Sequence, residues 1–234
     1  MPANPVAVAF RQGGQVRFAP ERVRETRIPR DRIGAVWSAL QQYADPQFNQ
    51  RATCVGADLV QFLILSGCRV GEACQLRWEN VRLDDPLPTY HLPATLTKTH
   101  LPLTHPASSA MRAVLERRLA QRSRGEEYVF PAVRGKKPYF QDPHKLFKKL
   151  TLIAGCPLHP HAMRRTTESI LQALDIDGDV RRTVLNHAPI DVHARHYSNS
   201  EPATLLPVME AVSDYVRQQA EAAKADIPSP YPPE

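Results

Sequence analysis

Several patterns that would define common protein classes are missing from this sequence of 234 residues. The four cysteines form no Cys-x-x-Cys pair, so we expect buried free thiols rather than a disulfide framework. No apolar run is long enough to cross a bilayer, and no signal segment opens the chain. Internal repeats are absent as well, which excludes a solenoid. A cytoplasmic protein with no membrane partner is therefore expected.

Positive charge is in moderate excess and is unevenly distributed. The chain has 30 Lys and Arg against 24 Asp and Glu, a formal net charge of +6. Residues 111–149 hold 11 basic and 4 acidic side chains, whereas acidic residues dominate from Ala203 onward. A basic surface favours a polyanionic partner. Any phosphate-facing surface is therefore expected before the C-terminal region.

Apolar residues at three- and four-residue intervals predict that most of the chain is helical. Helices are expected over residues 32–44, 55–66, 70–78, 111–122, 143–154, 161–174, 178–186 and 202–222. Short extended stretches, separated by prolines and polar residues, predict a small antiparallel sheet at 81–83, 90–92, 95–97 and 101–103. The fold class is α+β and mainly α-helical.

The chain divides into four expected parts. Residues 1–30 show no sustained period and are expected to be a poorly packed lead-in. Residues 31–200 form the globular domain, and residues 201–223 form a C-terminal helix with an apolar stripe. The proline-rich residues 224–234 are expected to be a disordered tail.

Two polar pairs stand where a helical core would favour apolar residues. Arg69 lies in a tight break between two apolar helices, and Glu72, on the same face, can orient its guanidinium. A purely structural ion pair is the alternative. His161 and Arg164 share one face of a predicted helix, a pairing that makes sense chiefly if an anion joins them. A first-turn histidine bonded to backbone is the alternative there.

Three further polar residues lie in turns or short exposed elements. Lys98 is flanked by two threonines, which mark a turn rather than a core position. His187 ends a Leu-Asn-His run. Tyr197 precedes Ser-Asn-Ser, so it is predicted on a short exposed element rather than in a core helix.

In this order these residues resemble the catalytic set of the tyrosine recombinases, the phage and genomic-island integrase family. The resemblance covers residues 31–200 and implies a catalytic fold with a three-stranded antiparallel sheet. It assigns catalytic roles to Arg69, Lys98, His161, Arg164, His187 and Tyr197, with Glu72 as a supporting residue. The sequence departs from the family pattern at Ala162-Met163, where Asp-Leu is frequent, and at Asn186, where Gly is common.

The resemblance implies that the Tyr197 phenolate attacks a DNA phosphodiester. A 3′-phosphotyrosyl bond and a free 5′-hydroxyl form, and a hydroxyl from another strand later reverses the step. Because bond energy is conserved, neither ATP nor a metal ion is needed, which accords with the missing phosphate loop and the missing carboxylate cluster. Two guanidinium groups, Arg69 and Arg164, fit the nonbridging oxygens.

Proton transfers fall to the remaining residues of the set. Lys98 is the family's usual donor to the departing 5′-oxygen. His161 either accepts the proton of Tyr197 or binds the phosphate, and His187 is a further hydrogen-bond donor to the phosphate. The sequence does not separate those roles.

Partners follow from the same resemblance. We expect a double-stranded DNA attachment site, nucleoid association, and self-association on DNA, as a tetramer in the full recombinase and a possible monomer alone. Such enzymes generally carry a core-binding domain that about 30 residues cannot encode, so a fragment or reduced form is expected. In relatives, a helix like 201–223 often docks on a neighbouring protomer. We expect the same here, the alternative being that it folds back on its own domain.

Part of the basic region over residues 111–149 is expected to follow the DNA backbone. Such a run of basic residues is more often only a solvated face. The residues of this part are Arg134, Lys136, Lys137, Lys145, Lys148 and Lys149. The other histidines, including His193 and His196, are interpreted as bystanders because no convincing set of metal ligands appears.

Two other functions stay open. The chain is alternatively a DNA-binding fragment, inactive in isolation because the core-binding domain is absent. A metal-dependent phosphoesterase built on the histidines is the other alternative. Nonspecific DNA relaxation, as by a type IB topoisomerase, would be a variant of the recombinase chemistry.

Overall fold

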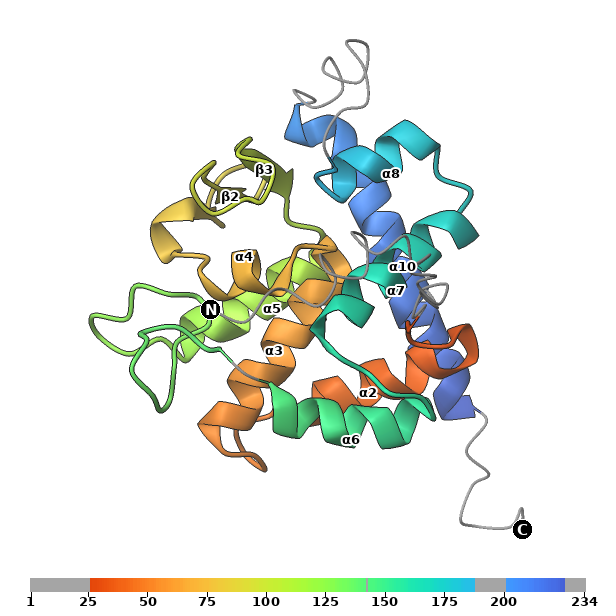
Figure 1. Ribbon diagram of the computed structural model, residues 1–234, viewed down its shortest axis with the longest axis horizontal. Helices are drawn as coiled ribbons and strands as arrows, with labels where there is room; N and C mark the ends of the chain where they lie inside the picture. Colours follow the sequence, from red (N-terminus) through yellow and green to blue (C-terminus); the bar gives the residue numbers. More distant parts are fainter. Residues whose placement is uncertain (1–25, 142, 188–200, 226–234) are drawn as a thin grey trace, which may run out of the picture.

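The computed structural model describes residues 26–141, 143–187 and 201–225. Helices surround a central helix, and a small sheet lies at one end of the bundle (Figure 1). The helices are η1 (Arg30–Arg32), α2 (Ile33–Tyr43), α3 (Arg51–Ser66), α4 (Val70–Cys74), η2 (Trp78–Asn80), α5 (Ser109–Ala120), α6 (His144–Ala154), α7 (Pro160–Ala173), α8 (Gly178–Val184) and α10 (Pro202–Ala225). The strands are β1 (Val81–Arg82), β2 (Thr89–Leu92) and β3 (Leu103–Pro106). The expected mainly helical α+β class is confirmed.

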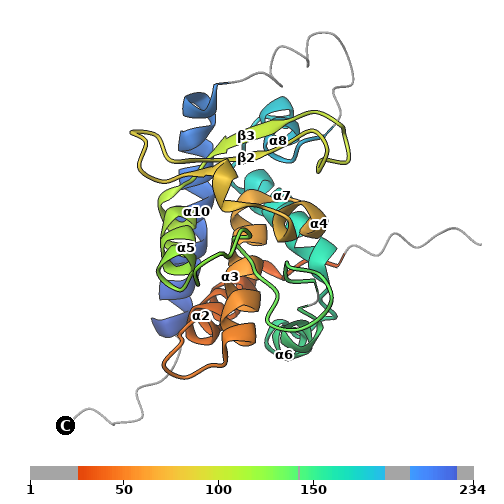
Figure 2. The same cartoon turned by 90° about the vertical axis from the view of Figure 1, so that its left-hand side faces the viewer.

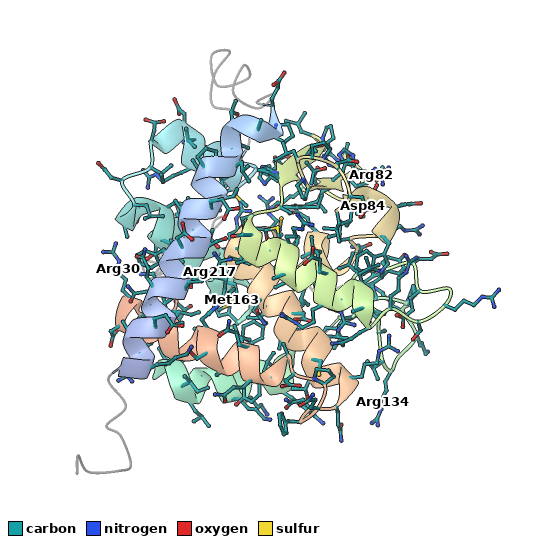
Figure 3. The ribbon with its side chains drawn as sticks, turned by 180° about the vertical axis from the view of Figure 1, so that it is seen from behind. Arg30, Arg82, Asp84, Arg134, Met163 and Arg217 are labelled. Carbon is teal, nitrogen blue, oxygen red and sulfur yellow. The ribbon has the colours of Figure 1, made fainter. Side chains whose placement is uncertain are left out.

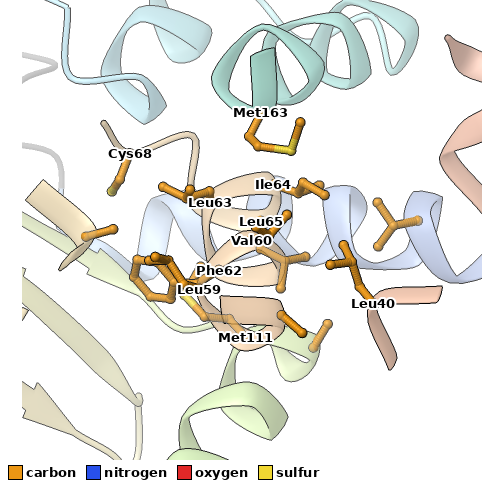
Figure 4. Packing of buried hydrophobic residues seen from close by; sticks show 14 of the residues in the cluster. Leu40, Leu59, Val60, Phe62, Leu63, Ile64, Leu65, Cys68, Met111 and Met163 are labelled. Atoms are coloured by element: carbon orange, nitrogen blue, oxygen red, sulfur yellow. The ribbon is translucent and has the colours of Figure 1, made fainter. Parts of the chain in front are cut away.

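Helix α3 is the centre of the hydrophobic core, since every residue from Cys54 to Ser66 is buried. Around it lie Leu40 from α2, Met111 from α5 and Met163 from α7 (Figure 4). Each fully buried side chain of this size stabilises the fold by roughly 1.5–3 kcal/mol. Helix α3 packs against most of the other helices, so its own position is fixed. The segments at its two ends are therefore held in place as well.

Helix α10 crosses α2 on the back of the molecule and packs against it (Figure 3). At Gly34 an added Cβ would lie 1.9 Å from the backbone oxygen of Gln219, so only glycine allows this approach. The apolar stripe of α10 is therefore buried within its own domain, the second of the two arrangements considered for this helix. The stripe comprises Leu205, Met209, Val212, Val216 and Ala220.

The three strands form an antiparallel sheet in the order β1-β2-β3. The expected strand at 95–97 is wrong, because these residues form a turn. The Thr97 hydroxyl donates to the carbonyl oxygens of Ala94 and Leu101, at 3.3 and 2.7 Å, within its own connection. Polar pairing inside the connection thus replaces pairing with a neighbouring strand.

A buried ionic group joins α3 to α5. Asp58 accepts hydrogen bonds from Arg117 at 2.6 and 2.8 Å and from Arg118 at 3.3 Å. Asp58 and Arg118 are almost fully buried, and burial raises the pKa of Asp58 although both arginines oppose the shift. Removing one partner would leave an uncompensated charge inside the protein. This contact ties α5 to the central helix.

Several element boundaries differ from expectation. The strand expected over 101–103 is β3, which begins only at Leu103 and continues to Pro106. Helix α3 begins at Arg51, four residues earlier than predicted, and the single helix expected over 70–78 is split into α4 and η2. The last residues of the predicted lead-in are packed, since Ile28 is 1% exposed and its N–H donates to Thr166 Oγ1 at 3.0 Å. Residues 1–25 and 226–234 lie outside the described part of the chain.

Candidate active site

The first arginine is positioned by the chain reversal at the end of α3. Gly67 ends the helix with φ of +64°, and an added Cβ would lie 2.6 Å from Leu185 Cδ2. Two residues later, Arg69 is extended at the start of α4. Glu72 accepts from the Arg69 backbone N–H at 3.1 Å and from its Nη1 at 3.1 Å. Glu72 thus contacts the Arg69 guanidinium, as the spacing of the two residues predicts.

Lys98 lies in the connection between β2 and β3, and its side chain is exposed. Its backbone N–H donates to Glu72 Oε1 at 3.2 Å. Thr97 is 2% exposed, which differs from the expected turn exposure because its hydroxyl bonds two carbonyls of the connection. Glu72 therefore links the segment of Lys98 to Arg69.

Arg164 lies on α7 and is 5% exposed. Its Nη1 donates to the carbonyl of Gly67 at 2.8 Å, and its Nη2 donates to the carbonyl of Leu185. A guanidinium has five N–H donors, so these two bonds leave donors for a further acceptor. Burial and then the charge of Arg69 lower the pKa of Arg164, so the two guanidinium groups lie close enough to repel each other.

Both histidines of the predicted set lie in the same positive field. Burial first, then Arg165 and Arg164, lower the pKa of His161, with His159 and Arg69 acting in the same direction. These cationic neighbours disfavour imidazolium, so His161 is held neutral at neutral pH. A neutral imidazole is the form that accepts a proton.

His187 lies just after α8 and is exposed. Burial of part of the ring and the charge of Arg164 lower its pKa, whereas Glu168 opposes that shift. A pocket of about 320 Å³ opens beside it. The lining residues are Glu168, Gln172, Gly178, Arg181, Arg182, Leu185 and His187.

The basic residues expected on DNA lie in the connection before α6 and on α6 itself. All six side chains are exposed, although Lys137 lies over the ring of Tyr139 and Lys149 over that of Tyr43. In Figure 2, α4, α6 and α7 lie to one side of α3, whereas α5 and α10 lie to the other. Figure 3 shows Arg134 extending from the edge of the molecule. The basic helix and the helices of both arginines thus share one side.

The remaining groups considered from the sequence are Tyr197, two further histidines, possible metal ligands and the cysteines. Tyr197, His193 and His196 lie outside the described residues. Within the described ranges, no three His, Cys, Asp or Glu side chains cluster as a metal site, and no helix is long and apolar enough to span a membrane. The four cysteines are free thiols, three of them buried.

Sequence reasoning did not predict the contacts between distant segments of this site, and one of them joins the neighbours of Lys98 and His187. Thr99 Oγ1, beside Lys98, donates to Asn186 Oδ1, beside His187, at 3.3 Å. The only sequence signal was Asn186 itself, which stands where the family commonly has glycine.

The fold and the clustered Arg, His and Lys segments define a catalytic domain of the tyrosine recombinase type. The chain belongs to the phage integrase family, whose model matches residues 35–203. The resemblance stated from the sequence is therefore confirmed. No curated protein matches the chain closely enough to be significant.

Three solved structures share the fold at low sequence identity. The XerH site-specific recombinase bound to difH substrate has a TM-score of 0.57 and 16% identity, over 77% of this chain and 52% of that one. The integrase from mycobacterium phage Brujita has a TM-score of 0.56 and 14% identity, over 90% and 67%. A lambda integrase dimer bound to a COC' core site has a TM-score of 0.53 and 17% identity, over 78% and 67%. The chain thus spans about half the length of XerH.

Proposed function

We propose that this chain is the catalytic domain of a site-specific DNA recombinase that cuts and rejoins strands through a phosphotyrosyl bond at Tyr197. The observation that carries the proposal is the hydrogen-bond network that brings these segments together, in which Arg164 donates to the carbonyl of Gly67 and Glu72 accepts from both Arg69 and the Lys98 N–H. Burial first, and then positive neighbours that include Arg69, lower the pKa values of Arg164, His161 and His187, so further positive charge is repelled in this region. A phosphate bound among them would relieve this repulsion, and the trigonal-bipyramidal transition state would relieve it more.

The chemistry needs such a field because phenol is a weak acid. With an ordinary pKa near 10, ionising tyrosine at pH 7 costs roughly 4 kcal/mol. Neutral His161 is proposed to take the phenolic proton, while the two guanidinium groups stabilise charge on the phosphate oxygens. Lys98, on its exposed connection, is proposed to give a proton to the departing 5′-oxygen. The bonds made and broken are both phosphate esters, so no energy source is consumed.

Covalent trapping tests this proposal. The protein would be incubated with a library of duplexes that carry randomised flanks and a nick, so that a short released strand diffuses away. A DNA adduct that resists denaturing electrophoresis is expected, and sequencing the attached DNA would identify the target. Tyr197→Phe should form none. Salt-sensitive binding without any adduct from the wild type would instead favour a DNA-binding fragment that is inactive in isolation.

We further propose that the basic connection and α6 hold the DNA backbone. Lys136, Lys145 and Lys148 are exposed, with no aromatic ring beneath them in the described residues. Each phosphate they neutralise should steepen the fall of affinity with salt by about 0.9 log unit per log unit of salt. Replacing the three by alanine should flatten that dependence, whereas Lys224→Ala on the distant end of α10 should not.

We also propose that the protein self-associates on DNA, on the basis of solved structures that share its fold. Structures with this fold include the lambda integrase dimer at a core site and a lambda integrase tetramer bound to a Holliday junction. Mass measurement of the DNA-bound protein tests it, and a single protomer on every selected site would contradict it.

A further inference from the structure

We propose that the hydrogen bond between Thr99 and Asn186 is a positioning device, which holds Lys98 in register with His187 across the scissile phosphate. Thr99 Oγ1 lies 3.3 Å from Asn186 Oδ1, although 87 residues separate the two along the chain. Each is the immediate neighbour of a residue in the predicted catalytic set. The inference rests on the proposed function, because it assigns Lys98 its role as proton donor.

The backbone at Asn186 explains how this side chain reaches the connection. Asn186 has φ of +48°, a left-handed conformation that favours glycine and that asparagine tolerates better than most residues. Its N–H closes the end of α8 by donating to the carbonyl of Thr183 at 3.0 Å. Asparagine satisfies the same turn as glycine and adds a side chain that can bond Thr99. The departure from the family pattern therefore has a physical use.

The segment that carries Lys98 has few other anchors to the domain. Thr97 and the backbone of His100 make their bonds inside the connection, with the His100 N–H donating to Thr97 O at 3.2 Å. Among the described residues, the polar bonds from this tip to other elements are the Glu72 contact with the Lys98 N–H and the Asn186 contact with Thr99. The first ties the tip to Arg69, and the second ties it to His187.

Two anchors on opposite sides restrict the tip more than one anchor does. Without the second, the connection could pivot about the Glu72 contact, and the Lys98 ammonium would lose its place relative to the phosphate. Misplacement of a catalytic group by about 1 Å can cost a hundredfold in rate. Asn186 and Thr99 are therefore positioning residues that act through Lys98.

Hydrogen exchange provides a test that does not depend on catalysis. In the DNA-free protein, Thr99→Val keeps the side-chain shape but removes the donor. We expect faster exchange of the Lys98 and His100 amides in that variant, and the same acceleration in Asn186→Gly, which keeps the turn but removes the acceptor. Thr95→Val, an exposed change in the same connection, is the matched control and should leave exchange unchanged. Unchanged exchange in both test variants would overturn the proposal.

A second test asks whether Lys98 is the group that moves. On the duplex selected by covalent trapping, both variants should form adduct about tenfold to a hundredfold more slowly than wild type. A substrate with sulfur in place of the 5′-bridging oxygen has a thiol leaving group, whose pKa is much lower than that of an alcohol and which therefore needs no proton. On that substrate the variants should match the wild type. A merely structural defect would slow both substrates equally.

The outcomes separate the two proposals. If the wild type forms no adduct, the proposed function fails, while hydrogen exchange still decides whether Thr99 and Asn186 hold the connection. If the wild type forms adduct and the variants are equally fast on the natural linkage, the positioning role is refuted. The double variant should be no slower than either single one, since each change removes the same bond.

Discussion

The carboxylate of Glu72 accepts a hydrogen bond from the backbone N–H of Lys98 at 3.2 Å, 26 residues further along the chain. The same oxygen accepts from the Arg69 guanidinium at 3.1 Å. One buried acid thus orients an arginine and anchors the segment of a lysine.

Glu72→Ala should therefore damage both stability and reaction. We expect the free energy of unfolding to fall by about 1–3 kcal/mol, because three partly buried N–H donors lose their acceptor. Adduct formation should also slow, since both Arg69 and Lys98 lose a support. Urea denaturation and trapping would measure the two effects. Glu79→Ala, an exposed carboxylate beside Arg77, is the control and should change stability by no more than about 0.5 kcal/mol.

Arg164→Lys should abolish most of the strand cleavage. Lysine keeps the positive charge but cannot donate in two fixed directions to the carbonyls of Gly67 and Leu185. Loss of a preorganised donor of this kind costs about 10²–10³-fold in rate. Single-turnover trapping would measure it, with Arg165→Lys as the control on the same helix. Equal rates in the Arg164→Lys variant and the wild type would remove Arg164 from the site.

His105 should make stability fall in acid. Burial lowers its pKa from 6.5 to about 4, and its Nδ1 lies 3.2 Å from the hydroxyl of Tyr90. Between those pH values His105 is protonated in the unfolded chain but neutral in the folded chain. The contribution of His105 to the free energy of unfolding is therefore fully present above pH 6.5 and is lost as the pH drops toward 4. The difference corresponds to about 3 kcal/mol.

Urea titrations at a series of pH values would show this dependence. Because carboxylates also titrate in acid, the informative quantity is the difference between the wild type and His105→Phe. The variant should lack the part of the slope that His105 causes. Parallel curves for the two proteins would contradict the expectation.

Gly34→Ala should destabilise the fold strongly. The new methyl would overlap the Gln219 carbonyl oxygen at 1.9 Å, and helix backbones at this contact cannot give way cheaply. A loss of about 1–3 kcal/mol is expected, as for other overpacked positions. Gly71→Ala meets no atom within 4 Å and is the matched control, expected to be neutral or slightly stabilising. Thermal unfolding would compare the two, and similar midpoints would refute the close approach of α2 and α10.

The elements of the fold that could be predicted are those with strong local signals. Helical periodicity located α2, α5, α6 and α7 to within two residues, and the break at Gly67 followed from a glycine after a buried helix. The residues 95–97 were misread because alternating threonine and leucine resemble a strand. Their polar groups instead bond one another across a tight connection, which is a tertiary outcome that alternation alone does not encode.

The site was predicted as a set of residues but not as a network. Arg69 with Glu72 follows from helical spacing, since three positions bring two side chains to one face. The contacts from Lys98 to Glu72 and from Thr99 to Asn186 span 26 and 87 residues, and no periodicity reports such distances. The packing of α10 on α2 depends on Gly34, whose importance appears only when the partner helix is in place.

The burial of the α10 stripe has a practical consequence for studies of assembly. Deleting residues 202–234 would remove the helix that covers α2 and β3, and would expose a broad apolar surface to water. Such a shortened protein would aggregate or unfold whatever its natural oligomeric state. Its measured mass would therefore not report whether the intact protein self-associates. Charge reversals at Asp214 or Glu221, which are exposed and whose ion pairs lie within α10, would probe that question while leaving the domain closed.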